Sequence, residues 1–503
     1  MQIVKLFNVL RHLGMRSPIT IVHLVITMFR SGSNLMTLLE IAAVKYKHRE
    51  AMTDDGQTVT YNQLLNLSRR KLRALNERVR DNDRVAFMCA NHIDFVATVF
   101  AVSRLGADVY LLPSRLREPE LQDLHEKQSF TLIVHDHTTA PTIAGVTVWN
   151  CENQLNETAP GRPSVGRKSS GRLVLFTGGT TGTPKSAAHS PSLFRFLDPF
   201  LDFISKLEIM NRERAYVATP LYHGYGIAVL ILFLITGKPL YFTKRFDATT
   251  AGKLISDHRV DVMTVVPMIV QRLLDTCLPE QLTTLRCMAS GGARLDDSVV
   301  RRTEKNARYG SLQFVWNFRN GAKLHATPKD LQESPGTIGR PIRGMRAVVM
   351  DGDKQQPVGS TGEIHIVNTW SSQSSTSGTG DVGWFDEHGR FYLLGRKDDL
   401  VIVGGVNVYP IELEQVLLQH EAIKAAAVIG ASDDEYGERL IGFVEMADHT
   451  KNTVDDVHTF LEERLQTSKR PRQLISVDAL PYTNVGKIDK KTLESQYKSS
   501  RFS

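Results

Sequence analysis

The sequence predicts an α/β fold, with a large N-terminal domain of layered parallel or mixed sheets and a small C-terminal α+β domain on a hinge. Short β-branched or apolar runs alternate with longer helical patterns, which is typical of sheets covered by helices. The runs lie at 84–89, 131–134, 173–177, 215–218, 240–243, 262–266 and 286–289. A chain of 503 residues is long enough for one large and one small domain.

Helices are predicted between these strands, for example at 93–104 and 298–306, and a strand turns into a helix across 58–65. The pattern changes after residue 398. The predicted order there is helix 411–420, strand 425–429, strand 440–446, helix 454–465 and strand 474–477. We therefore predict a basic N-terminal segment at 1–34, a large domain at 35–397 and a mobile small domain at 398–503.

The composition is that of an ordinary globular protein, with 42% hydrophobic and 23% charged residues. Its four cysteines, Cys89, Cys151, Cys277 and Cys287, form no Cys-x-x-Cys pair. This spacing argues against a zinc site or a disulfide framework and suits a reducing cytosol.

The net charge of +7 is concentrated at the two ends of the chain. Residues 1–39 hold four basic and no acidic residues, and residues 468–503 hold eight basic and three acidic ones. Basic ends suit lipid headgroups at one end and nucleotide or CoA phosphates at the other. No basic stripe interleaved with aromatic residues is present, so we predict no nucleic-acid partner.

The first fifteen residues have an amphipathic helical pattern. The apolar face consists of Ile3, Leu6, Phe7, Leu10 and Leu13, and the polar face of Lys5, Asn8, Arg11 and His12. The pattern fits a helix on an anionic membrane surface or one docked on the protein itself. No apolar segment is long enough to cross a bilayer, and no signal peptide is recognisable. We predict a cytoplasmic location, with peripheral attachment at the inner membrane face as the alternative.

The most informative stretch is 172–190. Its apolar run Leu173 to Phe176 suits a buried strand, and the following loop has three glycines and four threonines before Pro184 and Lys185. Glycine lets backbone N–H groups converge on an anion, while threonine hydroxyls and a lysine add donors and charge. The loop is therefore predicted to hold phosphate. It differs from the P-loop of NTPases, because Pro184 precedes the lysine where that motif has glycine.

This stretch resembles the phosphate loop of the adenylate-forming superfamily, which includes acyl-CoA synthetases, adenylation domains and luciferases. Six further segments resemble the other motifs of that family, in the family's order. They are 220–226, 290–293, 379–381, 394–399, 404–412 and 481–488. The resemblance runs from about residue 35 to the C-terminus, and it is greatest to bacterial fatty acid acyl-CoA synthetases.

The resemblance implies roles for individual residues. Lys487 would bridge the carboxylate and the α-phosphate, and His223 would border the acyl carboxylate. Asp381 would accept hydrogen bonds from the ribose, and Asp398 would be the hinge. The nucleotide- and CoA-binding residues would be Thr177, Gly178, Gly179, Thr180, Thr181, Gly182, Lys185, Gly292, Ala293, Asp381, Arg396, Gly404 and Gly405. Taken alone, Lys487 also fits a solvated surface lysine, and His223 a structural histidine.

The resemblance implies a fatty acid–CoA ligase that uses ATP, CoA and Mg²⁺ and forms acyl-AMP before acyl-CoA. Its substrate partner would be a fatty acid or another carboxylic acid. One alternative is a ligase for an aryl acid or for a carrier-protein acceptor. Another is a non-catalytic relative that binds acyl chains or nucleotide.

One motif departs from the family. The Tyr-Gly-x-Thr-Glu segment, whose glutamate holds Mg²⁺, should lie near residue 320, where this chain reads Asn317-Phe318-Arg319-Asn320-Gly321-Ala322-Lys323. A lysine at the metal position would repel Mg²⁺. Glu333 is a nearby replacement in sequence, and partial replacement of the cation by Lys323 is the other alternative. The metal ligands therefore stay undefined, and reduced or lost activity is the expected consequence.

We predict that Lys487→Ala separates the two half-reactions. Because the family's lysine serves adenylation alone, the variant should lose acyl-AMP formation by at least about a hundredfold, as when a charge-stabilising donor is removed. It should still convert supplied acyl-AMP and CoA to acyl-CoA. Both steps are followed by product formation, and equal losses would indicate a structural role for the lysine.

Overall fold

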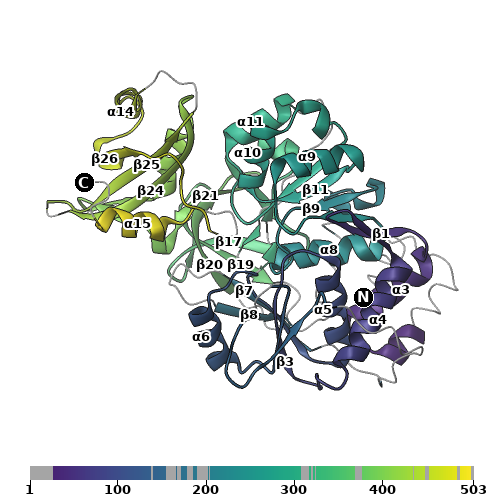
Figure 1. Ribbon diagram of the computed structural model, residues 1–503. Helices are drawn as coiled ribbons and strands as arrows, with labels where there is room; N and C mark the ends of the chain where they lie inside the picture. Colours follow the sequence, from purple (N-terminus) through teal and green to yellow (C-terminus); the bar gives the residue numbers. More distant parts are fainter. Residues whose placement is uncertain are drawn as a thin grey trace.

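A computed structural model describes most of the chain (Figure 1). The described residues are 26–137, 140–153, 166, 171–177, 185–189, 202, 204–306, 317–318, 321–322, 324–368, 376–433, 435–447, 453–483 and 488–499. For residues 177, 185–189, 304–306, 317–318, 321–322, 368 and 376–377, the backbone alone is described. The N-terminal pattern at 1–15 lies outside the described residues.

The first sheet has six strands in the order β6-β5-β3-β4-β7-β8. Neighbouring strands are parallel, except that β8 returns antiparallel to β7. The strands are β3 Arg84–Met88, β4 Asp108–Leu111, β5 Leu132–His135, β6 Thr147–Asn150, β7 Leu173–Thr177 and β8 Lys185–His189. Helix α6, Glu118–Gln128, packs on the outer face of this sheet.

The second sheet also has six strands, in the order β12-β11-β9-β10-β1-β2. All neighbours are parallel except β2, which forms a hairpin with β1. The strands are β1 Glu50–Asp54, β2 Gln57–Thr60, β9 Ala215–Val217, β10 Leu240–Phe242, β11 Val262–Val265 and β12 Cys287–Ser290. Its outer face carries α9 Ala248–Asp257, α10 Pro267–Thr276 and α11 Asp297–Asn306.

Four helices join the two sheets through one apolar core. They are α3 Leu35–Tyr46, α4 Tyr61–Leu75, α5 Ile93–Leu105 and α8 Gly224–Thr236, and their buried side chains form one cluster with residues of both sheets. Helix α8 is apolar on all sides, as expected for a helix buried in a core. Within the described residues, no helix combines the length and apolar character that crossing a bilayer requires.

A third sheet follows, in the order β15-β16-β21-β20-β19-β17-β18, and all its pairings are antiparallel. Its strands are β15 Leu324–His325, β16 Thr337–Pro341, β17 Met345–Asp351, β18 Lys354–Gln355, β19 Gly362–Asn368, β20 Thr376–Phe385 and β21 Phe391–Arg396. A two-residue pair, β13 Asn317–Phe318 and β14 Gly321–Ala322, precedes it. The sequence analysis predicted none of these strands.

The elements after the short helix η3, Lys397–Asp399, form a separate sheet with its own cores and lie to one side of the larger part (Figure 1). The strand order is β23-β22-β25-β24, with β26 beside β25. The elements are β22 Val401–Val403, β23 Val406–Val408, α13 Pro410–Leu417, β24 Ile423–Asp433, β25 Gly437–Met446, α14 Val454–Glu462, β26 Gln473–Ser476 and α15 Lys490–Lys498. The predicted α/β fold with a small α+β part is confirmed.

A buried tyrosine links two of the helices between the sheets. Tyr61 begins α4, is fully buried, and donates from its hydroxyl to the Leu234 carbonyl near the end of α8 at 2.8 Å. The Tyr46 ring of α3 packs beside it with a centroid separation of 5.7 Å. One side chain thus joins three helices.

We predict that Tyr61→Phe lowers the free energy of unfolding by about 1 kcal/mol, because one buried hydrogen bond is lost and the ring is kept. Urea denaturation followed by circular dichroism measures the change. Tyr436→Phe is the matched control, since Tyr436 is exposed. Equal stability of the Tyr61→Phe variant and the wild type would contradict the role of this bond.

Candidate active site

Three parallel strands end at one edge of the second sheet, and buried hydroxyls lie there. Since β9, β11 and β12 are parallel neighbours, their carboxyl ends meet at the same edge, where ligands bind in open α/β sheets. Thr219, Thr264 and Ser290 lie at or just beyond these ends. Their hydroxyls are buried and have no hydrogen-bond partner among the described residues. Because an unpaired buried hydroxyl is costly, this edge fits a polar ligand.

The segment from Pro220 to Gly226 forms a tight turn at this edge and leads into α8. Asn91, from the loop after β3, holds the turn with both ends of its amide. Its Nδ2 donates to the Thr219 carbonyl at 3.1 Å, and its Oδ1 accepts from the Leu221 amide at 2.8 Å. Asn91 is buried and lies 128 residues from Thr219 in sequence. The sequence analysis missed it, because no local pattern marks so distant a contact.

His223 lies at the end of this turn, immediately before α8. The Tyr222 ring is next to its imidazole, with centroids 4.4 Å apart. A Cβ on the following residue, Gly224, would lie 2.9 Å from Cδ1 of Leu175 in β7. The start of α8 is therefore close to the strand that leads into the predicted phosphate loop. The predicted motif at 220–226, which follows a strand of the second sheet, thus lies close to β7 of the first sheet, which leads into the other motif.

The phosphate loop joins β7 to β8, and Thr177 pairs with Lys185 where the hairpin begins. Residues Gly178, Gly179, Thr180, Thr181 and Gly182 lie outside the described residues, as do the side chains of Thr177 and Lys185. Lys487 also lies outside them. The predicted roles of these residues stay predictions.

The Gly292-Ala293 turn follows β12 at the same edge as the hydroxyl groups. Gly292 has a positive φ of 86°, and a Cβ there would contact Cγ1 of Val266 at 3.7 Å. The hydroxyl of Tyr225, in the first turn of α8, donates to the Ala289 carbonyl at 2.8 Å. The His223 turn and the Gly292-Ala293 turn are thereby held beside one another.

Asp381 and Arg396, on the neighbouring strands β20 and β21, face one another across the third sheet. They are directly opposed in register, and Nη1 of Arg396 donates to Oδ1 of Asp381 at 2.9 Å. The same Nη1 donates to the Thr379 carbonyl at 3.0 Å. Gly380 has a φ of 72°, and a Cβ there would lie 2.8 Å from the guanidinium. Both residues were predicted to contact nucleotide, and the structure brings them into one ion pair.

Glu363 of β19 supports this pair and was missed by the sequence analysis. It accepts from the Gly380 amide at 3.1 Å and from Lys397 at 3.2 Å. Burial alone would raise the pKa of Glu363, but these two bonds outweigh it and hold the pKa below the ordinary value. The carboxylate is thus ionised at neutral pH and fixes the loop that carries Asp381.

The Gly404-Gly405 turn belongs to the small C-terminal sheet. It joins β22 to β23, and its φ values are 54° and 81°. The Gly404 amide donates to the Tyr436 carbonyl at 3.1 Å. Asp398, the predicted hinge, is exposed and lies 3.6 Å from Arg396. Since Asp398 lies in η3, directly after β21, it stands between the third sheet and the small one.

The carboxylates near the altered Tyr-Gly-x-Thr-Glu segment are engaged elsewhere. Asp330 of α12, Pro328–Glu333, caps that helix and pairs with Arg340 at 2.5 Å. Glu333 pairs with Arg390 at 3.4 Å. The pKa of Asp330 is held below its ordinary value, because hydrogen bonds from Thr327 outweigh its burial. Side chains 317–323 are not described, and the described carboxylates that follow them do not form a magnesium site.

Two protein families together match most of the chain. The family described as AMP-binding enzyme matches residues 39–373. The family described as AMP-binding enzyme C-terminal domain matches residues 412–487. Both sets of site residues, those of the large sheets and those of the small one, fall in or between these matches.

Similar curated proteins are acid–CoA ligases. A 2-succinylbenzoate–CoA ligase of Bacillus pumilus is 28% identical over 457 residues, which cover 83% of this chain and 89% of the ligase. The long-chain-fatty-acid–CoA ligase FadD13 of Mycobacterium tuberculosis is 25% identical, with 84% of this chain and 90% of that ligase covered.

Solved structures share the fold. The o-succinylbenzoate CoA synthetase of Bacillus subtilis, in complex with its acyl-adenylate intermediate, has a TM-score of 0.78 at 23% identity, covering 91% of this chain and 97% of that one. The same synthetase is also known in complex with ATP and magnesium ion. ATP-bound MatB from Rhodopseudomonas palustris has a TM-score of 0.80 at 23% identity, covering 92% and 99%.

We predict that Asp381→Asn weakens ATP binding by about ten- to a hundredfold. The substitution keeps the shape but removes the charge that pairs with Arg396 and that is predicted to accept from the ribose, a loss typical of one charged hydrogen bond. Isothermal titration with ATP measures it. Asp386→Asn is the control, because Asp386 forms a similar pair with Arg390 at 2.8 Å at the far end of the same hairpin. Equal weakening in both variants would indicate general destabilisation instead.

Proposed function

The chain belongs to the family of AMP-binding enzymes, and from this membership we propose that it is an acid–thiol ligase. It would activate a carboxylic acid with ATP to an acyl-adenylate and then transfer the acyl group to CoA. The observation that carries this proposal is the Asp381–Arg396 ion pair, in the interval between the two matched families. A nucleotide-binding pair at the border of two parts suits a reaction in two steps.

The chemistry joins two anions, so the site must neutralise charge where the carboxylate meets the α-phosphate. In our proposal the backbone of the Thr177–Lys185 hairpin holds the phosphates, and Lys487 approaches from the small domain. Asp381 accepts from the ribose while Arg396 compensates its charge. The unpaired hydroxyls of Thr219, Thr264 and Ser290 supply donors at the strand ends. CoA would enter beside Gly404 and Gly405 once the small part turns about Asp398.

For the acid we propose a fatty acid. Helix α8 starts at His223 and has apolar residues throughout, including Ile227, Val229 and Leu230. An apolar wall beside the position expected for the carboxylate suits an alkyl chain. The relatives include a long-chain-fatty-acid–CoA ligase as well as several 2-succinylbenzoate–CoA ligases. An aryl acid is therefore the alternative within the same reaction class.

We also propose that adenylation is slow. The family's metal-binding glutamate has no counterpart near residue 320, and the described carboxylates of Asp330 and Glu333 are paired with arginines. These described residues therefore do not fit a Mg²⁺ ion bound by protein ligands. A non-catalytic relative that binds nucleotide or acyl chains is the rival function that this departure favours.

We place the protein in the cytoplasm, where ATP and CoA are available, with the parts 35–397 and 398–503 as its two domains. Attachment to a membrane through residues 1–15 stays a prediction, as does the absence of a nucleic-acid partner.

The decisive experiment is pyrophosphate release that depends on a carboxylic acid. We predict measurable release with fatty acids at a raised Mg²⁺ requirement, and acyl-CoA formation when CoA is added. Fatty and aryl acids are screened at several Mg²⁺ concentrations, with and without CoA.

Release with aryl acids alone would contradict the fatty acid proposal and leave the reaction class intact. ATP binding without release for any acid would favour the non-catalytic rival. Rapid release at ordinary Mg²⁺ would show that another carboxylate holds the metal.

A further inference from the structure

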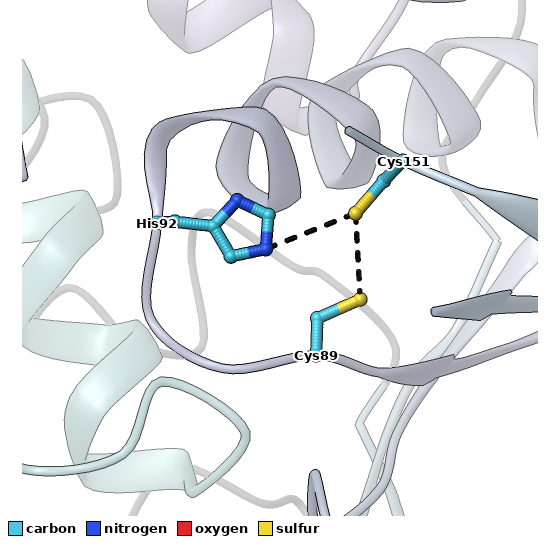
Figure 2. Close-up of side chains that lie close together, drawn as sticks. All are labelled: Cys89, His92 and Cys151. Atoms are coloured by element: carbon cyan, nitrogen blue, oxygen red, sulfur yellow. Dashed lines mark hydrogen bonds between the residues drawn. The ribbon is translucent and has the colours of Figure 1, made fainter. Parts of the chain in front are cut away.

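Two cysteines and a histidine meet beside the carboxyl ends of strands of the first sheet, and none of them was given a role in the candidate active site. Cys89 follows β3, His92 precedes α5, and Cys151 follows β6. All three are buried, with exposed fractions of 1%, 2% and 0%. Figure 2 shows the three side chains turned toward one another, with dashed lines joining the sulfur of Cys151 to His92 and to Cys89.

Two of the distances among the three ligand atoms match those around a tetrahedral zinc ion. The Sγ atoms of Cys89 and Cys151 are 3.7 Å apart, and Sγ of Cys151 is 3.8 Å from Nε2 of His92. All three atoms lie within 4.8 Å of one another. With Zn–S of about 2.3 Å and Zn–N of about 2.05 Å, tetrahedral angles place two sulfurs about 3.8 Å apart and a sulfur and a nitrogen about 3.6 Å apart.

From this geometry we propose that Cys89, His92 and Cys151 bind a zinc ion that the adenylation chemistry does not use. Thiolate sulfur and imidazole nitrogen are the ligands that Zn²⁺ prefers in proteins. Two thiolates neutralise the charge of the ion, which a buried site requires. Burial of all three ligands is typical of a structural zinc site and unlike an open catalytic one.

The carboxylate of Asp136 lies beside His92 but outside the group of three, and it would become the fourth ligand after turning toward the ion. Its Oδ2 lies 3.3 Å from Nε2 of His92, close to the separation of about 3.4 Å expected between a nitrogen and an oxygen on one zinc ion. The same oxygen accepts from the Ala90 amide at 2.8 Å, which holds the carboxylate beside the cluster. Asp136 has to turn from the histidine nitrogen toward the ion for this role.

A disulfide is the competing explanation for two neighbouring sulfurs, and the sheet register argues against it. Strand β5 lies between β3 and β6, and its His135 pairs with Met88 on one side and with Asn150 on the other. The backbones just before Cys89 and Cys151 are therefore two strand spacings, about 9.6 Å, apart. A disulfide requires Cα atoms within about 7 Å, so the backbone would have to move.

Zinc binding requires one local adjustment. Nδ1 of His92 accepts from the Phe95 amide at 3.2 Å and so caps the start of α5. A neutral imidazole that binds zinc through Nε2 carries its proton on Nδ1 and loses this bond. The lost cap is a single hydrogen bond, whereas the ion forms a coordinate bond with each of its ligands, so binding remains favourable.

The proposed ion would stabilise the loop that holds the active-site turn. Asn91, which clamps Thr219 and Leu221, lies between two of the ligands, Cys89 and His92. On the other side of the cluster, the buried Lys71 donates to the Cys151 carbonyl and pairs with Asp94 at 2.6 Å. Both ends of the cluster are therefore fixed by contacts beyond the ligands.

The sequence analysis predicted no zinc site, because it considered only Cys-x-x-Cys pairs. The signal it passed over is Cys89-Ala-Asn-His92, a Cys-x-x-His spacing that brings two ligands close together. The third ligand is 59 residues from His92 and could not be predicted from spacing.

The test measures zinc in the full-length protein, purified under reducing conditions with Zn²⁺ supplied and then freed of loose metal by gel filtration. We expect about one zinc per wild-type chain by mass spectrometry of the elements. Cys151→Ser should lose it. Cys277→Ser should retain it, because Cys277 lies outside the cluster and donates to the Ala248 carbonyl. Asp136→Asn should lower zinc affinity at least about tenfold.

A second measurement does not depend on a variant that folds. Replacing zinc by Co²⁺ in the wild-type chain should produce the thiolate-to-cobalt charge-transfer bands and the intense visible bands of a tetrahedral site. Wild-type protein without bound zinc, equal zinc in Cys151→Ser and wild type, or cobalt bound without thiolate bands would each overturn the proposal.

Discussion

The packing of α8 between the two large sheets is the constraint on which the rest of the structure depends. This helix is apolar on every side, so it is stable only when protein surrounds it, and the core it shares with α3, α4 and α5 extends to both sheets. Its first residues follow directly from the His223 turn. The hydrophobic effect thereby fixes a polar turn, since moving His223 would require moving a buried helix.

Polar contacts add specificity to the arrangement of the two sheets that the apolar core produces. Asn91 joins the loop after β3 to the turn before α8, and Asp54 of β1 accepts from the Ile93 amide at 2.6 Å. Each contact connects one sheet to the loop or helix of the other. Burial raises the pKa of Asp54 despite this bond, because the ionised carboxylate loses solvation free energy there. Such buried bonds make the relative position of the two sheets specific, which apolar packing alone does not.

Local patterns predicted most strands of the two large, mainly parallel sheets and none of the third sheet. Strand β11 was predicted at 262–266 and observed at Val262–Val265, and helix α5 was predicted at 93–104 and observed at Ile93–Leu105. These buried elements are apolar runs with clear ends. Strand β17, Met345–Asp351, has two fully buried residues among partly exposed ones, so its sequence carries little periodicity.

The sequence predicted the site residues that belong to short local motifs, but not the contacts between distant ones. Asp381 and Arg396 belong to short recognisable segments, whereas their pairing depends on the register of β20 and β21. Asn91, Glu363 and the Cys89–His92–Cys151 cluster act across distant parts of the chain. Apart from the Cys-x-x-His spacing of Cys89 and His92, no pattern within a window of residues marks such contacts, because the fold brings the partners together.

The junction at Asp398 has the physical character of a hinge. Its carboxylate is exposed, so the backbone there can turn without burying a charge. The contacts across the junction include the Tyr409 ring against Gly395 and a hydrogen bond from Gln271 to the Lys424 carbonyl at 2.9 Å. The Tyr409 contact is an aromatic ring packed on a glycine. The Gln271 hydrogen bond is exposed, so water can take the place of either partner. Contacts of this kind exchange at little cost, whereas the cores on either side of the junction stay closed. A rotation about Asp398 would therefore carry the Gly404-Gly405 turn as a rigid unit and leave the Asp381–Arg396 pair in place.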